Sequence, residues 1–408
     1  MLTINHNHTF KTIQIVFWYN EVLNEKTIAY RFLLGKLLRY YTDESKTAKK
    51  LNEEFSYLYG ARLSEGVKMF KGNHYLYYCL TIANADIVNE PNLLLEALKL
   101  YQKIVYNRQR FDNKNVNIVK KQLLELIEKR KEDKSEIAKL GYYNKVFSNH
   151  IFGKDLIGTK EEVSEITSEK LYDYYQNSFL NNELTITING DISESDEAFI
   201  RNNFPIAKDL PKPNLELETF VKNTEIQLHE EYTKMHQALI YIGYFSDITY
   251  DSKNYEAMVL MYILLGSSPD SRLFRIIREQ MMLAYEVDAE YDIDRKLLTV
   301  YAGVELSKKE LAQEKILDIM ENLIQYGPTV SELDSAKKYL KSVMYTSQDY
   351  QLSQTFREFL NLFFTENKTL EEKIKKIDAV TINDVKEVLN GLELTGIYIL
   401  HGDDENEE

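Results

Sequence analysis

Two side chains that can bind a substrate group lie in the stretch 264–287, LLGSSPDSRLFRIIREQMMLAYEV. Arg278 carries a guanidinium that can donate to a carbonyl without losing its charge, and Tyr285 carries a phenol that can donate to a developing oxyanion. A structural interpretation stands beside this one, in which Arg278 pairs with Glu279 or Glu286 and Tyr285 packs in the fold. The pair is therefore a candidate site for binding a carbonyl group.

The elements around this pair follow from the same stretch. An apolar helix over Ala257–Leu265 ends at Gly266 and a Ser-Ser-Pro-Asp turn. A second, amphipathic helix follows, in which Leu273, Ile276 and Ile277 form one apolar stripe. We expect Arg278 to lie mostly off that stripe, and Tyr285 to lead into a strand.

The order of these motifs resembles a signature in the second half of the pitrilysin/insulinase (inverzincin) zinc peptidases. The matching features are a small-residue turn, Ser-Arg-Leu-Phe at 271–274, Arg-Glu at 278–279 and Leu-Ala-Tyr at 283–285. Features of the first half resemble the short bacterial branch of that family; they are Leu58–Ala61, Phe152-Gly153, Gly158-Thr159 and Glu165–Thr167. The resemblance covers nearly the whole chain, and it implies that Arg278 and Tyr285 bind the peptide substrate.

The zinc-binding motif of this family has no counterpart at the expected place. The family carries H-x-x-E-H on the first helix, where two histidines hold zinc and the glutamate takes a proton from zinc-bound water. Here that slot holds residues 30–34, Tyr-Arg-Phe-Leu-Leu, none of which is a usual zinc ligand. We therefore expect no metal site, no cofactor and no catalytic residue of its own in this chain.

The remaining candidate ligands do not restore the motif. No two of the seven histidines are one helical turn apart; they are His6, His8, His74, His150, His229, His236 and His401. We expect His74, at the start of a strand, to be half-exposed in a sheet. Glu125 and Glu128 lie on the helix that carries the family's third ligand, and we expect both to be solvated. His6 and His8 are left as an adventitious metal-binding pair.

Composition bounds the class of protein. The chain has 408 residues, 44% of them hydrophobic and 28% charged, which indicates a globular protein of at least two domains. Its net charge of -14 and the lack of a basic patch argue against nucleic acid as a partner. The acidic balance either attracts basic peptides or serves solubility. The single cysteine, Cys79, predicts a buried apolar role.

Targeting signals and other catalytic motifs are missing from the sequence. The N-terminus lacks a signal-peptide pattern, and the longest apolar run is far shorter than a bilayer span, so we expect a cytoplasmic protein without a membrane partner. The sequence holds no G-x-S-x-G, P-loop or G-x-G-x-x-G motif. An enzyme with an unrelated, relocated site is kept as a third hypothesis.

Periodicity predicts a similar succession of elements in both halves. In the first half we expect strands at Thr12–Tyr19, Tyr75–Ala83 and Leu184–Ile188, and helices at Thr27–Tyr41, Thr47–Tyr57, Pro91–Tyr106, Asn115–Lys139 and Thr167–Asn177. In the second half we expect strands at Ala238–Tyr244, Leu297–Ala302 and Ile397–Leu400, with a helix that starts near Val380.

This repetition predicts the domain organisation. The helix start at Ile166–Leu171 is mirrored at Val380–Val385, and Asn-Gly-Asp at 189–191 is mirrored by His-Gly-Asp at 401–403, a period of roughly 200 residues that is too long for a solenoid. We expect α+β architecture with two tandem homologous domains, residues 1–203 and 216–408, joined by a proline-containing linker at 204–215. Each would be an antiparallel sheet with helices mainly on one face, which is the architecture that the resemblance implies.

The resemblance also implies a function. In the family, one subunit carries H-x-x-E-H, and a second subunit that lacks it supplies Arg and Tyr to the partner's zinc site. We therefore expect a zinc-free, non-catalytic subunit of a heterodimeric metallopeptidase, inactive alone, with a homologous H-x-x-E-H partner that holds zinc and with an unfolded peptide as substrate. The alternative is a pseudo-peptidase that acts as a structural or peptide-binding scaffold with no part in cleavage. A homodimer of the isolated chain is left open.

Overall fold

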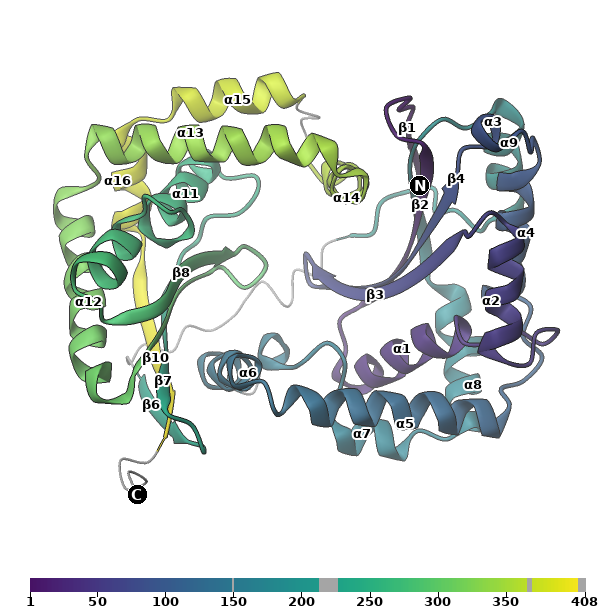
Figure 1. The fold of residues 1–408 in the computed structure, drawn as a ribbon, viewed down its shortest axis with the longest axis horizontal. Helices are drawn as coiled ribbons and strands as arrows, with labels where there is room; N and C mark the ends of the chain where they lie inside the picture. The colour runs from purple at the N-terminus through teal and green to yellow at the C-terminus, as the bar shows by residue number, and fades with distance from the viewer. Residues whose placement is uncertain (149, 213–226, 365–368, 403–408) are drawn as a thin grey trace. The chain divides into compact units, whose positions relative to one another are not determined.

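The computed structural model describes residues 1–148, 150–212, 227–364 and 369–402, which form two compact units (Figure 1). Unit 1 contains the described residues of 1–132, 155–212 and 348–363. Unit 2 contains those of 133–154, 227–347 and 364–402. Each unit therefore combines most of one half of the chain with one segment from the other half.

Unit 1 is built on a five-stranded sheet in the order β1-β5-β2-β4-β3. Neighbouring strands are antiparallel except β1 and β5, which run parallel. The central strand β2 is a run of β-branched and aromatic residues, which suits a strand buried on both faces. The strands are β1 (Leu2–Asn5), β2 (Thr12–Val22), β3 (Arg62–Phe70), β4 (Asn73–Ala83) and β5 (Glu183–Asn189).

Helices cover one face of this sheet and form the core of unit 1 with it (Figure 1). Alternate residues of β2, among them Ile15 and Phe17, point into that core. Side-chain caps begin several of these helices; Asn24, for example, accepts from the backbone N–H of Lys26. The helices are α1 (Glu25–Leu38), α2 (Ala48–Tyr57), α3 (Ala85–Val88), α4 (Leu93–Val105), α5 (Asn113–Arg130), α7 (Lys160–Glu165), α8 (Ser168–Asn177) and α9 (Glu194–Asn203).

Unit 2 repeats this plan with the strand order β6-β10-β7-β9-β8, again antiparallel except for one parallel pair, β6 and β10. Its strands are β6 (Gln227–Tyr232), β7 (Gln237–Phe245), β8 (Ala284–Asp292), β9 (Leu297–Glu305) and β10 (Glu393–His401). Its helices are α11 (Tyr255–Tyr262), the π-helices η3 (Ile263–Ser267) and η4 (Phe274–Gln280), α12 (Lys309–Tyr326), α13 (Val330–Thr346), α15 (Leu370–Ala379) and α16 (Ile382–Asn390).

A pair of equivalent lysines shows that the repetition extends to side-chain contacts. Lys120 of α5 donates to the carbonyl oxygens of Ser164 and Ile166, at the C-terminal end of α7. Lys337 of α13 donates to the carbonyl oxygens of Asp378 and Val380, at the corresponding end of α15. Each lysine satisfies carbonyl groups that a helix end leaves without a partner. The predicted duplication of an α+β domain is therefore confirmed.

Two helices, at equivalent places in the two halves of the chain, each pack on the sheet of the opposite half. The first-half helix α6 (Lys134–Val146) packs on β7 and β10 of unit 2, where Tyr142 stacks on Tyr241 with ring centroids 5.2 Å apart. The second-half helix α14 (Gln351–Asn361) packs on β2 and β5 of unit 1. There the ring of Phe359 stacks on Trp18 at 3.9 Å. Each sheet is thus covered on its second face by a helix from the other half.

Several predictions need correction. The single helix expected at Asn115–Lys139 is wrong: α5 ends at Arg130, and the side chain of Asp133 caps a new helix, α6. The strands β1 and β3 were not predicted, and β1 adds the parallel pairing to a sheet expected to be antiparallel throughout.

The expected linker lies partly in unit 1 and partly outside the described residues. At its start, the ring of Phe204 packs on Phe17 and Tyr101, and Ile206 bridges to Leu184 of β5. Residues 213–215 are not described. Because α6 and α14 belong to the units of the opposite halves, a single cut in the sequence does not describe the two units.

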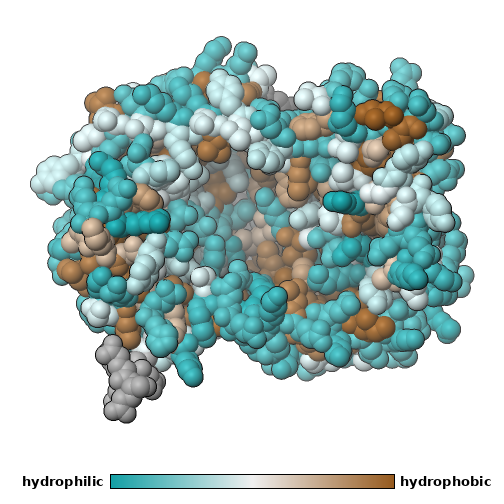
Figure 2. Space-filling view, viewed as in Figure 1, coloured by the Kyte–Doolittle hydropathy of each residue, from teal (hydrophilic) through white to brown (hydrophobic). Residues whose placement is uncertain are grey.

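The visible surface of both units is mostly hydrophilic, with apolar side chains scattered among polar ones (Figure 2). None of the helices in the described part of the chain combines the length and the apolar character that a bilayer crossing needs. Cys79 is buried, as predicted, and burial raises the pKa of its thiol to about 11.

We expect Phe359→Ala to destabilise unit 1 by about 3–5 kcal/mol, because it removes a fully buried ring and leaves a cavity against Trp18. Trp18 is the only tryptophan in the chain, so its fluorescence during denaturant unfolding reports this packing directly. Leu352→Ala, at a 45% exposed position of the same helix, is the control and should have little effect. Equal unfolding midpoints for the two variants would show that α14 does not stabilise this sheet.

Candidate functional site

The helix α1 buries the residues that occupy the family's zinc slot. Arg31, Leu33 and Leu34 have no exposed surface, and Tyr30 and Phe32 are partly buried against the core. The structure groups no three His, Cys, Asp or Glu side chains in metal-binding positions within the described ranges. A zinc site needs several deprotonated N, O or S ligands around one point. The side chains in this slot therefore do not fit zinc.

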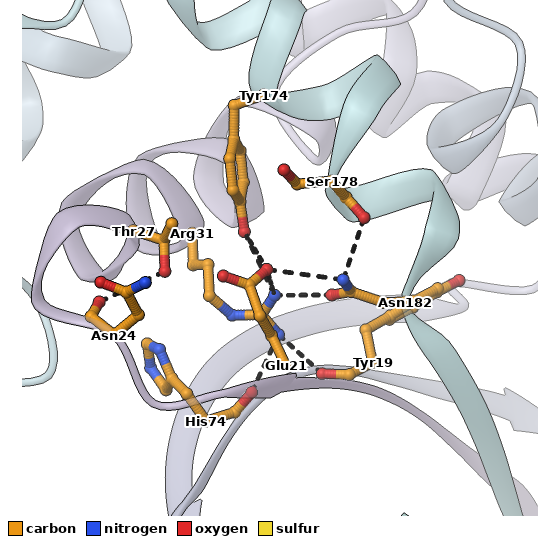
Figure 3. A network of polar contacts seen from close by, with 9 residues as sticks. All are labelled: Tyr19, Glu21, Asn24, Thr27, Arg31, His74, Tyr174, Ser178 and Asn182. Atoms are coloured by element: carbon orange, nitrogen blue, oxygen red, sulfur yellow. Dashed lines mark hydrogen bonds and ion pairs between the residues drawn. The ribbon is translucent and has the colours of Figure 1, made fainter.

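Arg31 is bound by a network of buried acceptors instead (Figure 3). Its Nη2 donates to the carbonyl oxygens of Tyr19, at 2.7 Å, and His74, at 3.0 Å, which lie on the neighbouring strands β2 and β4. Its Nη1 donates to the carboxylate of Glu21 at 2.8 Å and to the side-chain oxygen of Asn182 at 2.6 Å. The guanidinium thus connects α1 to two strands and to the segment after α8.

Glu21 is the anionic partner that balances the positive charge of the buried Arg31 guanidinium. A buried charge is costly unless it is paired and hydrogen-bonded. The same Oε2 atom of Glu21 accepts from Arg31 and from the phenol of Tyr174, at 2.6 Å. Burial raises the pKa of Tyr174, so this phenol stays protonated as a donor. The network is therefore a structural ion pair with its own hydrogen-bond shell.

His74 is fully buried, which corrects the prediction of a half-exposed sheet residue. It stands opposite Glu21 in the β2–β4 pair. Burial lowers the pKa of His74, and the nearby Arg31 lowers it further, so its imidazole is neutral. Its side chain lies under the helix because the pleat turns this position of β4 toward α1 (Figure 3).

Glu125, Glu128 and His8 lie on the surface. Glu125 and Glu128 of α5 are exposed and pair with lysines, Glu128 with Lys160 at 2.9 Å, which confirms that they are solvated. His8 is exposed and contacts the carboxylate of Asp191 at 3.0 Å.

Arg278 lies on the surface of unit 2. Its helix η4 is anchored by Leu273 and Ile277, which have no exposed surface and confirm two positions of the predicted apolar stripe. The Arg278 guanidinium lies over the ring of Phe274, 4.8 Å from its centroid, and forms no ion pair with any described residue. The structural interpretation, in which Arg278 pairs with Glu279 or Glu286, does not hold.

Tyr285 is also exposed, with 59% of its surface accessible. It occupies a β-bulge at the start of β8, between the paired residues Ala284 and Glu286, and such bulges redirect side chains at functional sites. Its phenol donates to Glu305 on β9 at 3.0 Å, and this hydrogen bond raises the pKa of Tyr285. The phenol is thus a protonated donor on the surface, and it does not pack in the core.

An ion-pair clamp holds the helix that carries Arg278, and the sequence interpretation missed it. The carboxylate of Glu332 on α13 accepts from Arg272 at 2.9 and 2.6 Å and from Arg275 at 3.1 Å. Burial would raise the pKa of Glu332, but hydrogen bonds from Arg272 and the Thr329 backbone lower it to about 2. The only local signal was the Thr329–Glu332 capping box, which does not reveal the distant arginines.

Comparisons with known proteins relate this chain to M16 peptidases and their inactive relatives. The family model described as "Peptidase M16 inactive domain" matches residues 165–340. A probable inactive metalloprotease, YmfF of Bacillus subtilis, is 24% identical over 96% of this chain and 93% of its own length. The uncharacterized zinc protease YmxG of the same species is 24% identical over 96% and 92%.

The fold of one solved structure is similar to that of this protein over the whole chain. The conserved protein from Enterococcus faecalis covers 100% of this chain and 97% of its own, with a TM-score of 0.91 and 26% identity. The fold is thus that of a two-domain, M16-like peptidase. The matches confirm the resemblance to the pitrilysin/insulinase zinc peptidases and to inactive members of the M16 family. With Arg31 and core leucines in the zinc slot, the chain is similar to the inactive, M16-like peptidase relatives.

We expect Glu332→Gln to lower the free energy of unfolding by about 3 kcal/mol at neutral pH, the scale of a broken buried ion pair. Because the folded pKa of Glu332 is depressed to about 2, its contribution is full above its usual pKa of 4.5 and is lost as the pH falls toward 2. Denaturant unfolding from pH 7 to pH 2 should therefore show a smaller acid-induced loss in the variant.

The control for this profile is Glu321→Gln, at an exposed position of α12. It should reproduce the acid profile of the unmodified chain. An equal loss of stability between pH 4.5 and pH 2 in Glu332→Gln and in the unmodified chain would contradict the role of Glu332 as a clamp.

Proposed function

We propose that this chain is the zinc-free subunit of a heterodimeric metallopeptidase whose partner carries H-x-x-E-H and binds zinc. In this proposal Arg278 and Tyr285 bind the peptide backbone near the partner's zinc and orient the carbonyl that is cleaved. The observation that carries the proposal is that both donors are exposed in unit 2 while the structure gives Arg278 no internal ion-pair partner in the described residues.

The chemistry of the two side chains supports a binding role. A guanidinium and a phenol are both donors that stabilise negative charge developing on a carbonyl oxygen, and in this proposal the Tyr285 hydroxyl turns from Glu305 to the substrate. The Glu332 clamp fixes the helix of Arg278, and the bulge fixes the direction of Tyr285. Donors that are positioned before the substrate arrives lose less entropy when it binds.

The edge of the unit 2 sheet supports the proposal that this chain binds an extended peptide. The strand β8 is the edge of the sheet, and its other side has no strand partner in the described structure. Extended peptides add to such edges through main-chain hydrogen bonds. Tyr285 begins this edge, so a peptide along β8 would pass the proposed donors.

The second candidate is a pseudo-peptidase scaffold that binds a partner or peptide and takes no part in cleavage. The buried zinc slot is compatible with it as well. The two candidates differ in what Arg278 does: a scaffold does not need an exposed guanidinium for the partner's turnover.

In a complex with the H-x-x-E-H partner and zinc, we expect Arg278→Ala to lower kcat for peptide cleavage by about 100-fold, the scale of losing one donor to a developing oxyanion. Assembly, followed by size-exclusion chromatography with light scattering, should be unchanged because Arg278 is exposed and supports no internal ion pair. Steady-state cleavage of a fluorogenic peptide measures the effect.

Two further variants sharpen this test. Tyr285→Phe removes only the hydroxyl and should also lower kcat. Arg201→Ala removes an exposed arginine of α9 in unit 1 and should leave cleavage unchanged. Full activity of the Arg278→Ala complex would exclude the proposed role and favour the scaffold.

A further inference from the structure

A surface pocket of unit 1 lies outside the elements that the proposed function uses. Its volume is about 490 Å³, which is within the range of ligand-binding pockets. Its walls come from the end of α2 and the turn that follows, and from the turn before α4 and the first residues of that helix. They include the rings of Tyr57 and Tyr59, the carboxylates of Glu90 and Glu96 and the side chain of Leu93. The pocket therefore combines aromatic, acidic and apolar groups.

The two tyrosine rings of this pocket are accessible to a ligand. Tyr57 is the last residue of α2 and is 86% exposed, and Tyr59, in the Leu58–Ala61 turn, is 52% exposed. Tyr59 has a φ of 54°, in the left-handed region that disfavours a bulky side chain. Strained residues of this kind are common at binding sites. Neither burial nor the backbone conformation therefore explains why tyrosines occupy these positions.

Glu90 is held in place beside the ring of Tyr59. Its backbone N–H donates to the carbonyl oxygen of Ala85 at 3.1 Å, and its Oε1 atom accepts from the phenol of Tyr59 at 3.2 Å. Glu96 is paired with Lys99 at 2.7 Å, whereas Glu90 forms no ion pair with a residue that the structure describes. Glu90 is therefore an exposed anion that the protein positions, and its charge is available to a cation from outside.

The equivalent turn of unit 2 provides a comparison inside the same chain. Tyr59 lies between α2 and the edge strand β3, and Met282 lies between η4 and the edge strand β8. Met282 has a φ of 52°, so the two turns share the left-handed conformation. A thioether has neither an aromatic face nor a hydroxyl that can bind a carboxylate. Because the turn also forms with methionine, its geometry does not require the tyrosine, and the aromatic pocket is a feature of unit 1.

The combination of groups in this pocket fits a guanidinium on an alkyl chain. A planar guanidinium can stack on an aromatic face and donate to a carboxylate at the same time, which a compact, strongly hydrated ammonium does less well. The methylene groups of an arginine can lie along an apolar side chain such as Leu93. Since both tyrosine rings are exposed, the pocket does not enclose a free small molecule. A side chain carried by a larger partner gains further contacts around the pocket.

We propose that this pocket binds an arginine side chain on the surface of another protein. The guanidinium stacks on the ring of Tyr57 and pairs with the carboxylate of Glu90. The basic surface around such an arginine is complementary to the net charge of -14 of this chain. The site uses neither Arg278 nor Tyr285, so it does not depend on the proposed role in cleavage.

The test uses the full chain and a pentapeptide with arginine between glycines, compared with the same peptide that carries citrulline, the neutral isostere of arginine. In a ligand-observed NMR titration at low ionic strength, the arginine peptide should bind about tenfold more tightly, and added salt should reduce the difference. Tyr57→Ala and Glu90→Gln should each weaken binding of the arginine peptide by about threefold. Both residues are exposed, so the Tm of each variant should match that of the unmodified chain.

The matched controls are Tyr326→Ala and Glu161→Gln, which change exposed residues outside the pocket and should leave the preference for arginine intact. Equal affinity for the arginine and citrulline peptides, or a preference that survives both pocket variants, would overturn the proposal. Free argininamide that binds as tightly as the arginine peptide would instead identify a small molecule as the ligand. Self-association in light scattering that Glu90→Gln abolishes would identify a second copy of this chain. Either result would overturn the assignment to another protein.

Discussion

The buried guanidinium of Arg31 is the contact on which the architecture of unit 1 depends. It joins α1 to the central strands β2 and β4 and to the segment after α8, and Glu21 balances its charge. Removing one member of a buried pair leaves an unpaired charge, which costs about 3–5 kcal/mol. Because α1 is held in this way, with leucines in the core beside Arg31, the helix cannot present zinc ligands without rebuilding the interior.

The two duplicated units differ in which of their arginine side chains are buried. In unit 1 the guanidinium of Arg31 on α1 is buried, and its two terminal nitrogens donate to acceptors of the protein itself. In unit 2 Arg278 lies on η4, which is not the equivalent of α1, and it is exposed, while the neighbouring Arg272 is buried against Glu332 and holds η4 in place. Unit 1 thus buries its ion pair between α1 and the sheet, and unit 2 has the exposed donors Arg278 on η4 and Tyr285 on β8.

Local patterns made much of this structure predictable. The central strands and the capped helices are encoded by short runs, and Arg278 was expected off the apolar stripe of its helix, where it lies. Features that depend on long-range contacts were not predictable. Apolar periodicity continues from α5 into α6 and does not say which sheet α6 covers. The edge strand β3 is interrupted by Glu65, Gly66 and Lys68, so it lacks a strand pattern. Nothing local predicts that Glu332 binds Arg272, or that Met282 adopts a left-handed conformation.

In the proposed function, cleavage is divided between two chains, and the partner binds the zinc. The most direct measurement is peptide hydrolysis in zinc-containing buffer by the isolated chain, by the H-x-x-E-H partner and by their equimolar mixture. We expect no hydrolysis by this chain alone and far more by the mixture than by the partner alone. Hydrolysis by the isolated chain that a chelator abolishes would contradict it.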